Sequence, residues 1–124
     1  IPQQPPFRFI DRLLTAEADN AVSEYLVRED GLLQDEGAMT TAALIENIAQ
    51  TCAAWLGQQS AEGKIGMIGA VKRMHVNKFP VVGERITTRV QVIQQVFSMT
   101  LVQAQVLHEE DLLASAEMKI ALMD

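Results

Sequence analysis

One charged residue, Glu46, lies in the whole segment from Met39 to Ser60. A helix on a protein surface normally carries Lys, Arg or Glu along the side that faces water, whereas this segment offers only Asn, Gln, Thr, Ala and Gly there. We therefore expect a helix that is enclosed on nearly every side. A lone carboxylate in such a helix is costly unless a partner satisfies it or a reaction uses it. The sequence thus makes Glu46 the first candidate for a functional side chain.

The periodicity of this segment predicts a long amphipathic helix. Thr40 or Thr41 suits its N-cap position. At roughly 100° per residue, the large apolar side chains fall on one broad face. They are Leu44, Ile45, Ile48, Cys52, Trp55 and Leu56. Glu46 and Gln50 lie one turn apart on a neighbouring stripe, and the small residues that flank this stripe allow a ligand or another backbone to approach closely.

The rest of the chain has the pattern of strands joined by short turns. Residues 21–28 predict a strand, residues 29–37 a loop, and residues 9–14 either a strand or a helical turn. Apolar or alternating runs predict further strands at 65–76, 86–92, 97–108 and 114–122. Consecutive strands with short turns indicate an antiparallel sheet. We therefore expect a single α+β domain over residues 1–124, with the sheet curled around the long helix.

Charge and composition limit the classes of function. The formal net charge is −6, which argues against nucleic-acid binding because phosphate neutralisation needs a basic face. No apolar run reaches the roughly 20 residues of a membrane span, so no membrane contact is expected. Cys52 is the only cysteine, which favours the reducing cytoplasm. The chain shows no metal-ligand spacing, phosphate-binding loop or nucleophile motif, so we expect neither a metal nor a cofactor.

The sign of the charge reverses in one short segment, residues 72–78. Its cations are Lys72, Arg73 and Lys78. Two interpretations stay open for this segment: it is the water-facing side of a strand, or it is a docking patch for an acidic partner.

Three short blocks of the sequence resemble motifs of a known protein family. They are Pro-Phe-Arg-Phe-Ile-Asp-Arg at 6–12, Ala-Leu-Ile-Glu-Asn-Ile-Ala-Gln at 43–50 and Pro-Val-Val-Gly-Glu at 80–84. In order and spacing they resemble the Pro-Phe-x-x-x-Asp-Arg, Leu-Ile-Ile-Glu-Ala-Met-Ala-Gln and Pro-Val-x-Pro-Gly-Asp blocks of the β-hydroxyacyl-acyl carrier protein dehydratases. The resemblance implies a hot dog fold, in which an antiparallel sheet wraps one long helix, and a dimer with acyl tunnels at its interface. Asp11 and Arg12 match the first block, and we interpret them as structural residues that pair to hold the N-terminal segment.

The resemblance also assigns roles to individual residues. The family's helix Glu lines the tunnel near the substrate hydroxyl, and the Gln one turn later helps to order the site, which implies a catalytic Glu46 and a substrate-binding Gln50. The family's general-base His precedes the helix in a Gly-His-Phe-Pro-Gly segment, but residues 32–39 contain no His. Gln34 stands there as a polar group that cannot accept a proton at useful pH. Thr41, with Thr40, replaces the family's Pro-Gly, whose glycine amide holds the thioester carbonyl, so Gln34 and Thr41 are further expected substrate-binding positions.

Removing water from a 3-hydroxyacyl thioester needs a base for the C2 proton and an acid for the departing hydroxyl. A buried Glu suits the acid role, because desolvation favours its neutral form. The sequence shows no evident base. His75 and His108 have the setting of surface or strand histidines, and Asp35 and Glu36 that of solvated loop charges.

Three functions from different classes therefore stay open. The first is a dehydratase-like protein that binds acyl thioesters in fatty acid or polyketide-like (aryl polyene type) biosynthesis, either with an altered site or as the reduced partner of a complete subunit. The second is an acyl thioesterase that uses the helix carboxylate. The third is a non-catalytic subunit in which Glu46 is a polar residue at a dimer seam. The expected partners are an acyl carrier protein or coenzyme A thioester and a second hot dog subunit, in a homodimer or a heterodimer, with Lys72, Arg73 and Lys78 docking the acidic carrier.

Overall fold

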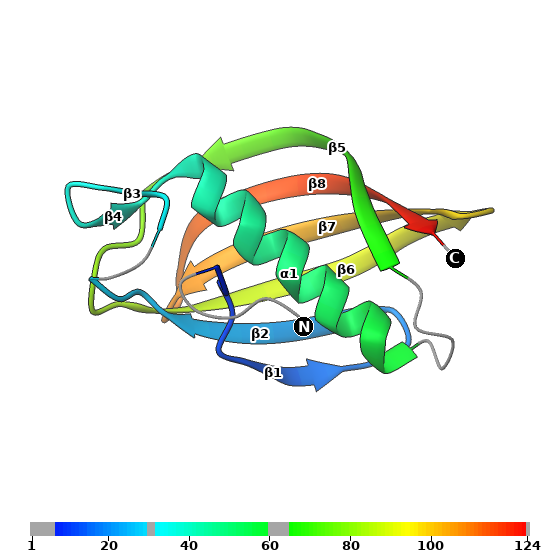
Figure 1. The fold of residues 1–124 in the computed structure, drawn as a ribbon, viewed down its shortest axis with the longest axis horizontal. Coiled ribbons are helices and arrows are strands. Elements are labelled where there is room, and N and C mark those ends of the chain that lie inside the picture. The colour runs from blue at the N-terminus through cyan, green and yellow to red at the C-terminus, as the bar shows by residue number, and fades with distance from the viewer. Residues whose placement is uncertain (1–6, 30–31, 60–64, 124) are drawn as a thin grey trace.

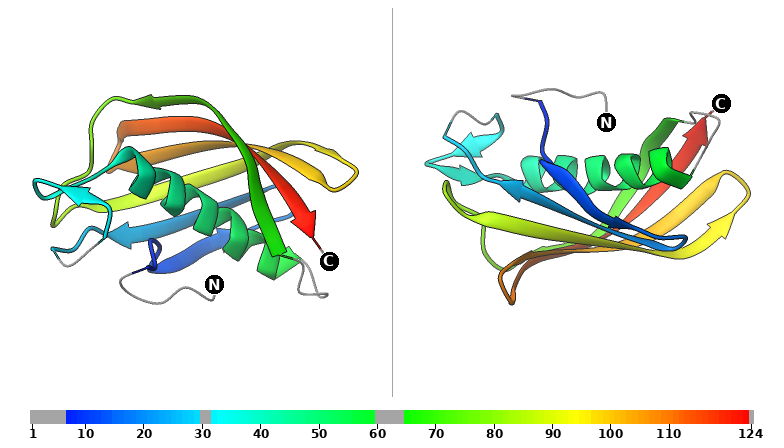
Figure 2. Two further views of the ribbon diagram at one scale, coloured as in Figure 1. Left: turned by 45° about the horizontal axis from the view of Figure 1, so that its top comes forward. Right: turned by 90° about the horizontal axis from the view of Figure 1, so that it is seen from below.

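The computed structural model describes residues 7–29, 32–59 and 65–123. Among these residues it has one α-helix, α1 (Thr41–Gln59), and a six-stranded antiparallel sheet in the order β1-β2-β6-β7-β8-β5 (Figure 1). The strands of this sheet are β1 (Arg12–Ala16), β2 (Asn20–Leu26), β5 (Ile65–Val76), β6 (Arg85–Val96), β7 (Met99–His108) and β8 (Asp111–Met123). Figure 2 shows the sheet curving around α1, which lies across its concave face. The architecture is the α+β arrangement that the sequence predicts.

Most of the predicted strands are confirmed, and β5 has the predicted bounds. The open choice for residues 9–14 is settled in favour of a strand, which begins at Arg12. The loop predicted over residues 29–37 is wrong in part, because β3 (Gln34–Asp35) forms a two-stranded hairpin with β4 (Ala38–Met39). The N–H of Met39 donates to the carbonyl of Pro80 (2.8 Å), and the N–H of Val82 donates to the carbonyl of Gly37 (2.9 Å). This distant pairing, which local composition does not reveal, stabilises so short a hairpin.

Helix α1 begins where the sequence places its N-cap. The hydroxyl of Thr40 accepts the N–H of Ala43 (3.3 Å), so Thr40 and not Thr41 is the capping residue. The predicted apolar face packs against the inward side chains of the sheet, although Ile45 is only half-buried. The helix residues of this core are Ala43, Leu44, Ile48, Cys52, Trp55 and Leu56. No helix in the described ranges is long and apolar enough to cross a bilayer.

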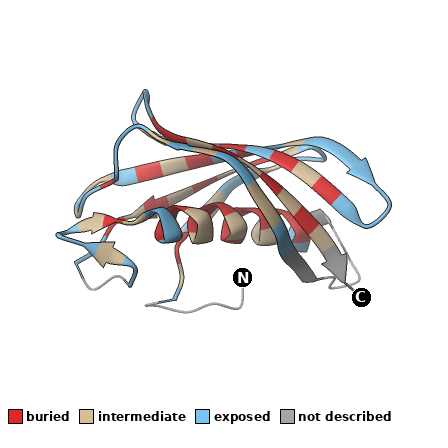
Figure 3. Cartoon of the chain, turned by 90° about the horizontal axis from the view of Figure 1, so that it is seen from above, coloured by how far each residue is buried: buried red, intermediate tan, exposed pale blue. Residues whose placement is uncertain are grey.

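The side of α1 that points away from the sheet is open to solvent in this chain. Helical spacing places Ala42, Glu46, Ala49, Ala53 and Gly57 on one side, where Ala42 and Gly57 are exposed and the other three are half-buried. Figure 3 shows exposed and half-buried stretches along α1 between the buried ones. The expectation of a helix enclosed on nearly every side is therefore wrong for the single chain. The described part of the chain leaves a row of small side chains, with Glu46 among them, that another surface can approach closely.

Cys52 is buried in the core, and its burial predicts an alkaline instability. Desolvation raises the pKa of the thiol from 9.0 to about 12, so the folded protein keeps the thiol proton at pH values where the unfolded chain loses it. Above pH 9 the unfolded state then binds fewer protons, and the free energy of unfolding falls by up to about 1.4 kcal/mol per pH unit. Urea unfolding between pH 8 and pH 11 should show a shallower decline for Cys52→Ala than for the parent chain. Parallel declines would show that the thiol ionises equally in both states.

Candidate active site

Glu46 lies in the second turn of α1, on the side that points away from the sheet. Its carboxylate accepts a hydrogen bond from Nε2 of Gln50 (3.4 Å), one turn along the helix. Because the side chain is only half-buried, this chain alone does not supply the desolvation that the sequence analysis assumed for the acid role. A second surface over the open side of α1 is needed to enclose Glu46.

Gln50 is buried and is bonded mainly to the backbone of the segment that precedes β1. Its Oε1 accepts the N–H of Phe9 (2.6 Å), and its Nε2 donates to the carbonyl of Phe7 (2.9 Å) as well as to Glu46. Both N–H groups of the amide are therefore in use within the chain. This arrangement lets Gln50 orient Glu46 and hold residues 7–9 beside it, while a direct contact of Gln50 with substrate stays a prediction.

Asn47 is a site-forming residue that the sequence analysis missed. Its Nδ2 donates to the carbonyl of Phe9 (2.6 Å), and its Oδ1 accepts the hydroxyl of Thr88 in β6 (2.5 Å). Asn47 and Gln50 thus bind both polar groups of the Phe9 backbone, as a neighbouring strand would. The sequence did contain a signal for this contact, because Asn47 in the helix and Thr88 in β6 are polar residues at inward-facing positions.

The buried polar network continues from Asn47 to β2. The hydroxyl of Thr51 donates to the carbonyl of Asn47 (2.8 Å), and it lies 2.7 Å from the hydroxyl of Ser23. Because Thr51 uses its only proton toward Asn47, Ser23 is the donor of the second bond. The network joins the centre of α1 to β2 and β6 and so holds the helix against sliding along its axis.

Thr41 lies at a hollow of about 270 Å³ beside the start of α1. Asp35 and Phe79 also line it, and the remaining lining residues are Ala38, Met39 and Thr40. Gln34 is not among them, and its Nε2 donates to the carbonyl of Arg28 (2.5 Å). The structure therefore places Thr41 where a ligand could reach the helix start, whereas one N–H of the Gln34 amide is bonded to the backbone. Neither Gln34 nor Glu46 lines this hollow.

Neither histidine is hydrogen-bonded or ion-paired to Glu46 in the described residues. Nδ1 of His108 is 3.0 Å from Oε2 of Glu84, whose other oxygen accepts the N–H of Val81 (2.8 Å). His75 is exposed on β5, as a strand histidine would be. Within the described residues, no group of three or more His, Cys, Asp or Glu side chains could hold a metal ion.

The charged residues of the first motif do not pair as expected. Asp11 accepts the N–H of Leu26 (2.7 Å) and is bonded to the guanidinium of Arg28 (2.7 Å), whereas Arg12 pairs with Glu24 (2.7 Å). Successive residues of an extended chain point to opposite sides, so Asp11 and Arg12 cannot face each other. Asp11 still ties the N-terminal segment to the end of β2, which is the structural role predicted for it.

The predicted docking patch lies on and just after β5, an edge strand of the sheet. Lys72 and Lys78 are exposed, whereas Arg73 is bonded to Glu117 of β8 (2.5 Å). Hydrogen bonding and charge repulsion from Lys119 lower the pKa of Lys72, because two cations share this part of the surface. The structure thus brings Lys119 into the patch and partly neutralises Arg73.

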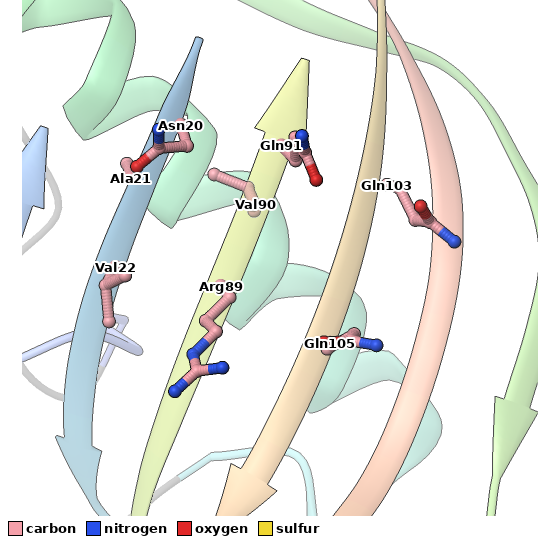
Figure 4. Close-up of a pocket in the computed structure, with 8 residues that line it drawn as sticks. All are labelled: Asn20, Ala21, Val22, Arg89, Val90, Gln91, Gln103 and Gln105. Atoms are coloured by element: carbon pink, nitrogen blue, oxygen red, sulfur yellow. The ribbon is translucent and has the colours of Figure 1, made fainter. Parts of the chain in front are cut away.

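A second hollow, of about 360 Å³, lies on the face of the sheet opposite α1 (Figure 4). Arg89 projects there among the side chains of Gln91, Gln103 and Gln105. The sheet separates this hollow from Glu46, so the hollow is not part of the candidate site.

A long helix on the concave face of a curled antiparallel sheet defines a hot dog protein, here with one carboxylate in the second turn of the helix. The chain belongs to the ApeP-like family, described as ApeP dehydratase, whose sequence model matches residues 1–123. Compared with the β-hydroxyacyl-acyl carrier protein dehydratases that its motifs resemble, the chain is a divergent member, since the segment before the helix lacks their general-base His. No curated protein matches the chain.

Solved structures show the same fold at low sequence identity. The dehydratase heterocomplex ApeI:P from Xenorhabdus doucetiae is 14% identical, with a TM-score of 0.87 over 100% of this chain and 88% of that one. The protein smu.793 from Streptococcus mutans UA159, bound to acetyl CoA, is 10% identical, with a TM-score of 0.80 over 99% and 95%. Zebrafish thioesterase superfamily member 2 is 16% identical, with a TM-score of 0.75 over 90% and 80%. At these identities the likeness establishes the fold.

Proposed function

We propose that this chain is the Glu46-bearing subunit of a 3-hydroxyacyl thioester dehydratase and works in a heterodimer with a second hot dog subunit that supplies the base. The observation that carries the proposal is the position of Glu46 on the open, small-residue side of α1, held by Gln50 but not enclosed. A carboxylate placed in this way needs a covering surface to become a general acid. The ApeI:P structure, a dehydratase built from two kinds of subunit, supports a covering surface of the same fold.

The proposed reaction divides acid and base between two chains. The partner's base removes a proton from C2 of the 3-hydroxyacyl thioester, and that electron pair forms the C2–C3 double bond. The C3–O bond breaks as the protonated Glu46 gives its proton to the departing hydroxyl, which leaves as water. Glu46 is then a carboxylate and takes up a proton from solvent before the next turnover, while the partner's base releases to solvent the proton that it took from C2. Covering α1 would desolvate Glu46 and favour the protonated form that the first step requires.

Gln50 and Thr41 have distinct roles in this proposal. Gln50 holds the Glu46 carboxylate and the Phe7–Phe9 backbone at the edge of the site. Thr41 lies at the first turn of α1, where backbone N–H groups lack helical partners, and it contributes to holding the thioester carbonyl. Gln34 is the uncharged polar side chain of the segment before the helix, and its bond to the carbonyl of Arg28 gives it the role of holding that segment in place.

The substrate is proposed to arrive as an acyl carrier protein or coenzyme A thioester. The acetyl CoA in the Streptococcus mutans structure supports thioester binding by this fold. Lys72 and Lys78, together with Lys119, form the unbalanced part of the basic patch and would attract an acidic carrier in a salt-dependent manner. Arg73 contributes less, because Glu117 already neutralises it.

The test compares the chain alone with the chain co-expressed with a second hot dog protein from the same source, chosen because it carries a Gly-His-Phe-Pro-Gly segment. Each preparation is incubated with 3-hydroxyacyl and saturated acyl thioesters of coenzyme A, and the products are followed by mass. We expect loss of one water from the 3-hydroxyacyl substrate with the complex, and little or none with the chain alone. Release of free acid from both substrates would replace the proposal with a thioesterase. Binding without conversion by the complex would replace it with a non-catalytic subunit.

A further inference from the structure

The hairpin formed by β6 and β7 reaches beyond the other strands at the end of the sheet opposite the start of α1 (Figures 1 and 2). Its tip is apolar and open to solvent. Phe97 is fully exposed at the turn, and Ile93 and Val96 are 50% and 46% exposed. The chain carries no charged residue from Val92 to Gln103. An uncharged, apolar projection of this kind is unusual on a protein surface unless another surface covers it.

The backbone of the turn does not explain why Phe97 is there. Phe97 has a φ of 56°, in the left-handed region that favours Gly, Asn or Asp. A bulky aromatic residue at such a position is uncommon, and here its ring gains no burial within the chain. Local folding would therefore be served better by a small residue, and the aromatic ring points to a contact outside the chain.

A hollow of about 210 Å³ lies on the same hairpin, next to the tip. Val96, Met99 and Leu101 form its apolar wall. Gln94, Thr100 and Lys119 complete the lining. A cavity of roughly 150 Å³ is known to hold benzene, so this hollow has room for one phenyl ring. The hairpin thus carries both an exposed aromatic ring and a site that can receive one.

The hairpin is complementary to itself, since it carries an exposed aromatic ring and a hollow with room for one, and this favours a second copy of this chain as the occupant. Two copies, each with a net charge of −6, repel each other over most of their surface, but the hairpin is uncharged and is flanked by Lys119. Interface centres are depleted of charge and enriched in aromatic residues and Met, as this tip is. An anionic lipid surface is disfavoured, because docking there requires clusters of Lys and Arg that the tip lacks.

We propose that the β6–β7 hairpin is a self-association site, in which Phe97 of each of two copies inserts into the hollow of the other. Because ring and hollow lie on one hairpin, a two-fold axis between the tips places both rings at once, which closes the assembly at two copies. In a heterodimer this contact joins two heterodimers through the chain described here. It does not depend on the proposed activity.

The test measures the molar mass of the chain by light scattering or sedimentation over a range of concentrations, without substrate. Phe97→Asn removes the ring but suits the positive φ of the turn, and Gln94→Lys places a charge in the hollow. Each variant should raise the dissociation constant at least ten-fold, whereas Leu14→Asn on β1, another exposed apolar residue, should not. A parent chain whose mass does not rise with concentration, or an association that Phe97→Asn leaves unchanged, overturns the proposal.

A cross-link shows where the copies meet. Ser98→Cys places a thiol next to Phe97, and Cys52 does not compete because it is buried. Under mild oxidation Ser98→Cys should give a disulfide-linked dimer more than ten times faster than Gln103→Cys, which lies on the exposed face of β7. Equal rates would place the contact elsewhere. A different outcome would show a membrane contact instead. In that case the parent chain, but not Phe97→Asn, binds neutral lipid vesicles, and the molar mass of the parent chain without vesicles does not rise with concentration.

Discussion

Replacing Glu46 by Gln in the proposed heterodimer is expected to lower the rate of the proposed dehydration by about 100-fold or more, because positioned general acids contribute roughly that factor. Gln keeps the length of the side chain and can still hydrogen-bond to Gln50, but its amide has no proton that it can give to a departing hydroxyl. The single-turnover rate of enoyl thioester formation, followed by mass, measures the effect. The midpoint of thermal unfolding should stay nearly constant, since the carboxylate is only half-buried.

Gln58→Ala is the matched control for this prediction. Gln58 is an exposed polar residue of the same helix, far from the first turns, and its loss should leave both rate and stability unchanged. Unchanged turnover in Glu46→Gln would remove Glu46 from the mechanism and leave it a polar residue at a subunit seam. If the complex instead releases free acid, loss of that activity in Glu46→Gln would assign Glu46 to thioester hydrolysis.

The long helix and the strands were predictable because each carries a strong local period. The core face of α1 follows from residue spacing, since a buried helix face repeats every three to four residues, whereas the bounds of β5 follow from a continuous, mostly apolar run. The hairpin of β3 and β4 was missed because backbone bonds to residues 80–82 stabilise it. A local pattern carries no information on such a contact.

The candidate site was predictable only in part, for reasons of distance along the chain. Motif resemblance identified Glu46 and Gln50, but the bonds from Asn47 and Gln50 to Phe9 join residues about 40 positions apart. The pairing of Asp11 with Arg28 was missed because adjacency in sequence was taken for adjacency in space. The open side of α1 was misjudged for a different reason. The residue types on a helix face do not distinguish a face that the same chain covers from one that a second subunit would cover.

The second large effect is expected at Asn47, whose replacement by Leu should lower the free energy of unfolding by about 3 kcal/mol, since two buried groups lose their partner at roughly 1–3 kcal/mol each. Leu has a similar shape but leaves the carbonyl of Phe9 and the hydroxyl of Thr88 unbonded. Urea unfolding measures the loss. Adding Thr88→Val removes one of the orphaned groups, so the double variant should recover part of the loss, whereas Thr87→Val, on the other side of β6, should not. A loss well under 1 kcal/mol in Asn47→Leu, or full additivity with Thr88→Val, would mean that the network does not hold α1 to the sheet.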